Sequence, residues 1–251
     1  MDEGNLCVVG SLNDVNVLHE REVELMRSNR ALEELAVIAT HEMREPLRMI
    51  ELYLALLVDR SKGKLDVETQ ELMQTVVKSS RRMKVFIDNL LNFSRADRFR
   101  ENFELVDGVR ILEETLSLLK PMLDGNRVRM IRDPLPKFIG SRSLLVQLFA
   151  NLIQNAIKFR GKVPLEIKIS AERTTKEWVF SVQDNGIGIP REHFDDIFVM
   201  FRRLHAHSEY SGSGIGLAFC KKIVDHHRGR IWVESEVGKG STFFFSIPDP
   251  Q

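Results

Sequence analysis

The chain has 251 residues, of which 43% are apolar and 29% charged, as in globular proteins of one or two domains. Basic and acidic residues number 36 each, so the net charge is zero and we expect no nucleic-acid partner. No apolar run approaches the roughly 20 residues that cross a bilayer, which predicts no membrane contact within this chain. Cys7 and Cys220 lack metal-type spacing, and we expect free thiols and a cytoplasmic location.

The N-terminal segment has two patterns in succession. Residues 1–16 include Asn-Leu-Cys-Val-Val-Gly and an Asp-Val pair, and they resemble the last strand of a PAS sensor domain. For so short a stretch, chance similarity is the alternative. Leucines at 18, 25 and 32 then recur every seven residues, with Asn29 at an a-type position. This pattern predicts a parallel coiled coil whose polar a position fixes its register as a dimer.

A helical hairpin is predicted next. Leu47, Ile50, Leu54 and Leu57 recur at helical spacing before a break at residues 60–64. Asp66 is then suited to cap a second helix. The apolar face of that helix includes Leu72, Val76, Met83, Ile87 and Leu90. Two such helices have too small a core to stand alone, so we expect a homodimeric four-helix bundle.

The pattern changes after residue 98. Apolar alternation at 165–169, 178–182 and 243–247 predicts strands, and helical periodicity appears at about 108–120, 142–159 and 214–227. We therefore predict an α+β protein, with a helical-hairpin domain followed by an α/β sandwich whose helices cover one sheet face. The expected boundaries are 1–16, 17–98 and 99–251.

One histidine lies in a distinctive setting. His41 is followed by Glu42, and Pro46 interrupts a continuing helical pattern. Proline removes the backbone bond to the carbonyl of Glu42, so we expect a kink beside His41. A carboxylate that accepts a proton from one imidazole nitrogen makes the other nitrogen a better nucleophile. A kinked helix with a surface histidine is the alternative.

Two glycine-rich loops predict an anion-binding region. The first follows a predicted strand and contains Asp184, Gly186 and Gly188; taken alone, it also fits an ordinary turn. The second precedes a helical run and contains Gly212, Gly214 and Gly216. Backbone amides at a glycine-rich helix start bind phosphates. The motif is not a P-loop, because no Gly-Lys-Ser/Thr follows.

Polar residues also line one face of the helix predicted at 142–159. Asn151 and Asn155 are four residues apart, and Lys158 lies nearby on the same face. An amide oxygen suits Mg²⁺, which takes few protein ligands alongside phosphate and water. The alternative is an amphipathic helix whose polar residues face solvent.

Taken in their order along the chain, the His41 segment, the Asn151–Asn155 helix and the two glycine-rich loops resemble the H, N, G1 and G2 boxes of sensor histidine kinases. The resemblance covers roughly residues 17–248. The segments His-Glu-Met-Arg-Glu-Pro-Leu-Arg, at 41–48, and Phe-Arg-Arg-Leu-His, at 201–205, resemble those of the phytochrome-like subgroup. The resemblance implies ATP-dependent autophosphorylation of His41 with help from Glu42, followed by transfer to a response-regulator aspartate. It also implies ATP and Mg²⁺ as cofactors. By this resemblance, Asp184 would contact adenine, Asn155 would bind the metal ion, and Lys158 would contact a phosphate.

The same resemblance extends to a segment over the nucleotide. Phe198 and Phe201 match the family's F box and are expected in the core and at the base of a lid. Arg203 aligns with a lid arginine that reaches the γ-phosphate. Asn151 stands where hydrolytic relatives of the fold carry a glutamate that activates water, which predicts phosphoryl transfer instead of hydrolysis.

Three residues depart from the family pattern: Glu45 replaces a usual Thr or Asn, Ser141 an aspartate, and Arg228 the first glycine of His-Gly-Gly. Only the change at Glu45 puts an activity in doubt, that of dephosphorylating the regulator. Two rival functions remain at this point. One is a non-catalytic dimeric scaffold, against which the intact Asn155, Asp184 and glycine loops argue. The other is a simple ATPase of the same fold, against which Asn151 argues.

Overall fold

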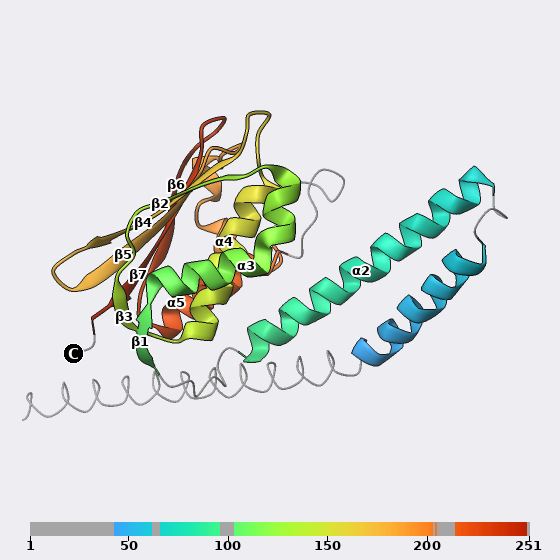
Figure 1. Ribbon diagram of the computed structural model, residues 1–251, viewed down its shortest axis with the longest axis horizontal. Helices are drawn as coiled ribbons and strands as arrows, with labels where there is room; N and C mark the ends of the chain where they lie inside the picture. Colours follow the sequence, from blue (N-terminus) through green and yellow to red (C-terminus); the bar gives the residue numbers. More distant parts are fainter. Residues whose placement is uncertain (1–42, 62–65, 96–102, 203, 205–213, 250–251) are drawn as a thin grey trace, which may run out of the picture. The chain divides into compact units, whose positions relative to one another are not determined.

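The computed structural model describes residues 43–61, 66–95, 103–202, 204 and 214–249 (Figure 1). The PAS-like strand and the coiled coil predicted before residue 42 lie outside these residues. The chain divides into two compact units, Met1–Ser94 and Arg95–Gln251.

The first unit is a hairpin of two helices, residues 43–60 and α2 (Val67–Arg95). Asp66 Oδ1 accepts a hydrogen bond from the amide of Thr69 at 2.7 Å, which confirms the predicted cap and lowers the pKa of this carboxyl. Ion pairs between described residues join the helices, among them Arg44 with Asp88 at 2.6 Å and Glu51 with Lys84 at 3.1 Å. Helical backbone continues through Pro46, while the carbonyl of Glu42, where we expect the kink, lies outside the described residues.

The hairpin buries few of its apolar side chains. Leu47 and Ile87 are buried, whereas most other described apolar residues of the two helices are exposed. The exposed set comprises Met43, Ile50, Leu52, Tyr53, Leu56, Leu57, Val58, Val67, Leu72, Val76 and Met83. One hairpin therefore leaves an extended apolar surface in contact with water. Among the residues that the structure describes, no helix has both the length and the apolar character of a membrane span.

The second unit is built on a five-stranded sheet in the order β2-β4-β5-β7-β6. β2 and β4 pair in parallel, and the other neighbours are antiparallel. The strands are β2 (Arg129–Arg132), β4 (Glu166–Arg173), β5 (Glu177–Asp184), β6 (Ile231–Glu236) and β7 (Gly240–Pro248). Two short strands, β1 (Glu104–Asp107) and β3 (Lys137–Gly140), form a separate antiparallel pair.

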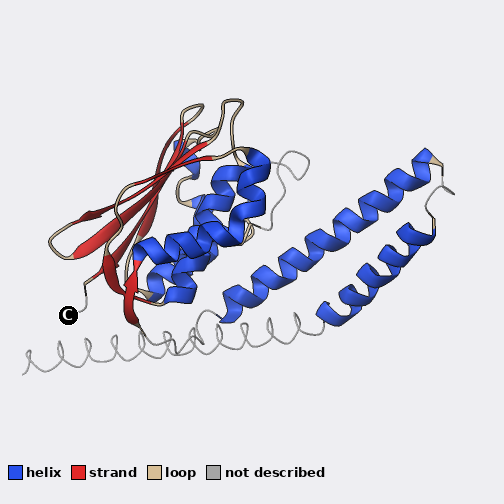
Figure 2. Ribbon diagram, in the orientation of Figure 1, coloured by secondary structure: helices blue, strands red, loops and turns tan. Residues whose placement is uncertain are grey.

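Three helices, α3 (Gly108–Asn126), α4 (Arg142–Lys158) and α5 (Gly216–His226), lie on one face of this sheet (Figures 1 and 2). The predicted α+β class and sandwich are therefore confirmed. The core between helices and sheet contains Phe149 from α4, Phe180 from β5 and Phe245 from β7, all fully buried. Phe180 and Phe245 stack with ring centroids 4.9 Å apart, and Phe149 meets Phe245 edge-on at 5.4 Å.

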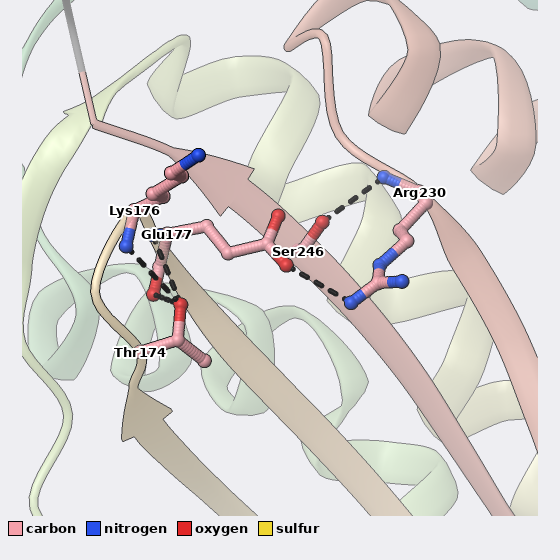
Figure 3. Close-up of polar contacts among 5 residues, drawn as sticks. All are labelled: Thr174, Lys176, Glu177, Arg230 and Ser246. Carbon is pink, nitrogen blue, oxygen red and sulfur yellow. Dashed lines mark hydrogen bonds and ion pairs between the residues drawn. The ribbon is translucent and has the colours of Figure 1, made fainter.

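Polar contacts fix the start of β5 (Figure 3). The hydroxyl of Thr174 closes the β4–β5 turn, because it accepts the amide of Glu177 at 3.2 Å and donates to that residue's carbonyl at 3.0 Å. Arg230, just before β6, donates to the Glu177 carboxylate at 3.1 Å, and its amide donates to the Ser246 hydroxyl. Glu177 and Asp184 are the two ends of β5, so these contacts lie one strand length away from Asp184.

The end of α5 depends on an arginine in a left-handed conformation. Arg228 has φ 58°, its amide donates to Asp225, and the next amide, from Gly229, donates to Val224. These are the two bonds of a Schellman motif, in which glycine is usual at the left-handed position. The departure noted at Arg228 thus places a side chain where the backbone favours glycine.

We expect Arg228→Gly to raise the free energy of unfolding by about 1 kcal/mol, because the left-handed strain exceeds the added chain entropy of glycine. Urea denaturation of the two proteins measures the difference. Arg228→Ala is the control, since it removes the same side chain but keeps a Cβ at positive φ. A gain as large in the alanine variant would show that the side chain, and not backbone strain, is responsible.

Candidate functional site

The site begins with the carboxylate at the end of β5. Asp184 lies between β4 and β7, opposite Ile167 and Ser241. Its Oδ1 accepts hydrogen bonds from the amides of Gly186 at 2.8 Å and Ser241 at 3.4 Å. Burial raises the pKa of this carboxyl above its usual value, and the two amide bonds oppose the rise. The result is a largely buried acceptor with a fixed orientation.

The glycines after Asp184 allow the loop to pass close to two other backbones. A Cβ on Gly186 would collide with the carbonyl oxygen of Phe159, to which Ile187 donates at 3.0 Å. Gly188 has φ 72°, and a Cβ there would collide with Glu236. The loop is therefore held between the end of α4 and the β6–β7 turn, which explains why the motif needs both glycines.

The predicted polar face of α4 is present. Asn151, Asn155 and Lys158 are each half-buried, and Leu152, Ile153, Ala156 and Ile157 between them are buried. A Cβ on Gly216 would lie 3.6 Å from Asn151 Oδ1, so this side chain reaches the first turn of α5. Lys158 Nζ lies 4.3 Å from the centroid of the Phe159 ring. Thus α4 meets the Asp184 loop at its end and α5 near its middle.

A backbone hydrogen bond holds the end of the second glycine-rich loop, just before α5. Phe201 donates to the carbonyl of Gly214 at 3.0 Å, and both residues have positive φ, 64° and 72°. The two residues lie on either side of the predicted lid segment, residues 202–211, in the sequence. The expectation that Phe201 is also a core residue is wrong, since it is 54% exposed. Phe198, in a short 3₁₀ turn (Asp196–Phe198), is only half-buried.

Four of the predicted site residues, His41, Glu42, Arg203 and Gly212, lie outside the described residues. The others are brought together in two groups. Asp184, Gly186 and Gly188 belong to one loop beside the end of α4. Gly216 begins α5 beside Asn151, and Gly214, two residues earlier, lies against Phe201. Asn155 and Lys158 lie on the α4 surface between Asn151 and the Phe159 carbonyl.

Sequence reasoning missed the polar side chains that hold this loop. Asn185 accepts the amide of Glu166 and donates to the carbonyl of Pro164, each at 2.9 Å. Ser235 Oγ accepts the amide of Ile189 at 2.8 Å. A signal for Ser235 exists, because a Gly-Lys-Gly turn between two strand patterns predicts a hairpin that pairs Ser235 with Ser241.

The Ser141 departure also has a structural counterpart. Ser141 precedes α4 without making a side-chain cap to it, and its amide donates to Nε2 of the buried His227 at 3.0 Å. The other ring nitrogen of His227 lies 2.7 Å from the carbonyl of Ile223. The histidine is therefore a neutral tautomer protonated on Nδ1, and it links the start of α4 to the end of α5.

Two family models match this chain. Residues 31–99 match the His Kinase A (phospho-acceptor) domain, and residues 140–251 match the Histidine kinase-, DNA gyrase B-, and HSP90-like ATPase. Cyanobacterial phytochrome A of Nostoc sp. is 44% identical over 90% of this chain and 29% of its own length. Phytochrome-like protein Cph1 of Synechocystis sp. is 40% identical over 89% of this chain and 30% of its own length.

Full-length ShkA in complex with AMPPNP has the same fold, with a TM-score of 0.67 and 24% identity over 86% of this chain and 45% of that one. ThkA in complex with the response regulator protein TrrA has a TM-score of 0.62 and 23% identity over 91% of this chain and 66% of that one. The chain belongs to the histidine kinase family, with a phospho-acceptor domain followed by a nucleotide-binding domain of the ATPase type. It spans less than a third of the length of the two phytochrome relatives.

Proposed function

We propose that this chain is the autophosphorylating core of a two-component histidine kinase, which transfers the γ-phosphoryl group of ATP to His41 and then to a response-regulator aspartate. The observation that supports this most is the largely buried Asp184 carboxylate, held by the amides of Gly186 and Ser241 beside the end of α4. The complex of ShkA with AMPPNP supports nucleotide binding by this fold.

The base and the phosphates would be recognised by different parts of the site. The Asp184 carboxylate accepts a hydrogen bond from the adenine amino group, and Gly186 leaves room for the ring. The amides at the start of α5, from Gly214 onward, bind phosphate oxygens, as helix N-termini do. Lys158 adds a positive charge at the end of α4.

Asn155 fits a magnesium ion that is shared with the nucleotide. Among the described residues there is no group of three or more His, Cys, Asp or Glu side chains able to hold a metal. A half-buried amide on α4 suits a cation that takes most of its oxygens from phosphate and water. Asn155 would hold the ion through its side-chain oxygen, and the ion supplies charge stabilisation to the phosphates.

Phosphoryl transfer needs a nucleophile and a positive charge that offsets the charge on the transferred group. One imidazole nitrogen of His41 forms the new N–P bond as the bond from the γ-phosphorus to the bridging oxygen breaks and ADP leaves. Glu42 accepts the proton from the other nitrogen. Arg203 offsets the charge on the transferred group. Asn151 has an amide where a hydrolytic enzyme needs a base, so water is not activated.

The exposed apolar residues of the hairpin support a homodimer, in which a second copy covers them in a four-helix bundle. The complex of ThkA with the response regulator TrrA supports a receiver domain as the second partner. Transfer from phosphohistidine to the receiver's aspartate forms an O–P bond as the N–P bond breaks.

Incubation with ATP labelled at the γ-phosphate distinguishes this function from its two rivals. A kinase retains acid-labile label on the protein, a simple ATPase releases labelled phosphate, and a scaffold does neither. We expect acid-labile label on the chain with little free phosphate. Release of phosphate without protein label would replace the proposal with ATP hydrolysis.

Glu45 bears on whether the protein also removes phosphate from its regulator. It comes four residues after His41 in the sequence, is exposed and pairs with Arg48 at 2.6 Å. The hydrogen bonds from Arg48 lower the pKa of the Glu45 carboxyl, so it is ionised at neutral pH. A carboxylate repels the acidic, phosphorylated pocket of a regulator, whereas a hydroxyl orients water there without adding charge.

Phosphatase activity should accordingly be weak in the wild type and several-fold higher in Glu45→Thr, while autophosphorylation changes little. The measurement is the decay of a purified phosphorylated regulator in the presence of ADP. Glu71→Thr, the same exchange at an exposed position of α2, is the control. Fast decay with the wild type, or an equal gain from the control, would show that Glu45 does not set this balance.

A further inference from the structure

The hydroxyl of Ser235 joins three parts of the nucleotide-binding domain. It donates to the carbonyl of Gly240 at 2.8 Å and accepts the amide of Ile189 at 2.8 Å. The hydroxyl of Ser241 lies 2.9 Å away. A serine hydroxyl offers one donor and two acceptor positions, so Ser241 is the donor in this pair and Ser235 uses its full capacity.

Ser241 connects the Ser235 hydroxyl to Asp184. The amide of Ser241 donates to Asp184 Oδ1 at 3.4 Å, and the two residues are register partners between β5 and β7. Ser241 therefore fixes the start of the loop 184–189, and Ser235 fixes its end through Ile189. Between them, Ile187 accepts the amide of Gly238 from the β6–β7 turn at 2.8 Å.

We propose that Ser235 is a positioning residue for the Asp184–Ile189 loop and that its hydroxyl sets the preference of the site for adenine over guanine. The inference rests on the proposed nucleotide-binding function and adds a residue that does not touch the base. Ser235 holds the end of the loop at Ile189, and Asp184, at the start of the loop, carries the only carboxylate in it. A change at Ser235 therefore alters how the loop orients that carboxylate.

The expected effect is on selectivity more than on binding as a whole. Adenine presents an amino donor to a carboxylate, whereas guanine presents a carbonyl oxygen that the carboxylate repels. This discrimination requires the carboxylate to stay in place. Phosphate binding at the start of α5 uses other groups and is common to both nucleotides. A loosened loop therefore lowers the ratio of ATP to GTP affinity.

The same sheet contains a matched control. Ser170 on β4 and Ser181 on β5 form a serine pair with their hydroxyl oxygens 2.6 Å apart, also partly buried. Ser170 and Ser181 lie outside the Asp184–Ile189 loop, and the hydrogen bond between them does not involve it. Ser170→Ala removes a serine–serine hydrogen bond of the same kind, so it reports what such a loss does to stability alone.

The test compares Ser235→Thr with Ser235→Val, which have nearly the same shape and differ in the hydroxyl. Dissociation constants for ATP and GTP are measured by calorimetry with magnesium, alongside the wild type and Ser170→Ala. We expect the ratio of ATP to GTP affinity to fall by about threefold to tenfold in the valine variant, as for one lost hydrogen bond. The threonine variant and Ser170→Ala should keep the wild-type ratio.

Equal ratios in the threonine and valine variants would overturn the inference while leaving the proposed function intact. The same holds if the valine variant does not fold and the threonine variant does, because the hydroxyl is then a folding element only. An equal fall in Ser170→Ala would also overturn it. Failure of the wild type to bind ATP at all would instead remove the proposed function and this inference together.

Discussion

His41→Gln should abolish autophosphorylation and leave the affinity for ATP nearly unchanged. Glutamine keeps a polar side chain of similar length but has no nitrogen lone pair able to attack phosphorus. The nucleotide-binding residues belong to the second unit, which begins after Ser94, so their binding of ATP does not depend on the histidine itself. The measurements are acid-labile label from γ-labelled ATP and calorimetric titration with ATP.

His193→Gln is the control for this exchange. His193 is a partly exposed histidine of a short 3₁₀ turn (Arg191–His193), and it lies near the carboxylates of Glu192 and Asp196. We expect this variant to label like the wild type. Undiminished acid-labile label in His41→Gln, or loss of label in the control variant, would contradict the assignment of His41.

Asp184→Asn should weaken ATP binding by about 1–3 kcal/mol, the cost of an unmatched buried polar group. The amide oxygen can still accept from Gly186 and Ser241, so the loop is retained. The side chain then presents its NH2 group to the adenine amino group, so that two donors face each other. Asp133→Asn is the control, because Asp133 is a carboxylate of the same domain that pairs with Lys168 at 3.3 Å. An unchanged affinity in Asp184→Asn would exclude the carboxylate from adenine recognition.

The raised pKa of Asp184 adds a dependence on pH. Binding of an amino donor favours the ionised carboxyl, so wild-type affinity should fall on acidification, and it should begin to fall above the usual pKa of an aspartate. The asparagine variant should lack this part of the profile. The affinity for ATP is measured across the acidic pH range for both proteins. Subtracting one profile from the other removes the contribution of the protonation of ATP itself, which is the same in both.

The same carboxyl affects stability with the opposite sign. Its pKa is higher in the folded state than in the unfolded chain, so folding binds protons and stability falls as pH rises through the folded pKa. At neutral pH the ionised, largely buried carboxylate is therefore unfavourable for folding. Asp184→Asn should be at least as stable as the wild type there, even though it binds ATP less well.

The helices α3, α4 and α5 and the strands β4, β5 and β7 of the second domain followed from apolar periodicity. Ile167, Phe180, Val182 and Phe245 lie at alternate positions of their strands and are all buried in the sheet. The short strands β1, β2 and β3 have four residues each, too few for a periodic pattern, and the sequence analysis did not identify them. β6 was also missed.

Residues whose role depends on distant contacts were harder to predict. Phe201 has the spacing of a core aromatic, but its left-handed backbone conformation and its bond to Gly214 leave the ring exposed. The Gly-Lys-Gly turn indicates that Ser235 pairs with Ser241, but its contact with Ile189 joins residues 46 apart in the sequence and is seen only in the fold. Asp184 and its glycines were predictable because the loop's chemistry is contained in consecutive residues.

The most direct test of the central claim is to find which residue carries phosphate after incubation with Mg-ATP. Trypsin releases the peptide 31–44, whose only histidine is His41 and whose only hydroxyl residue is Thr40. Mass spectrometry under alkaline conditions should detect one phosphate on this peptide, located at His41 and lost on brief acid treatment. Acid-stable phosphate on Thr40, or phosphate on a different peptide alone, would contradict the account.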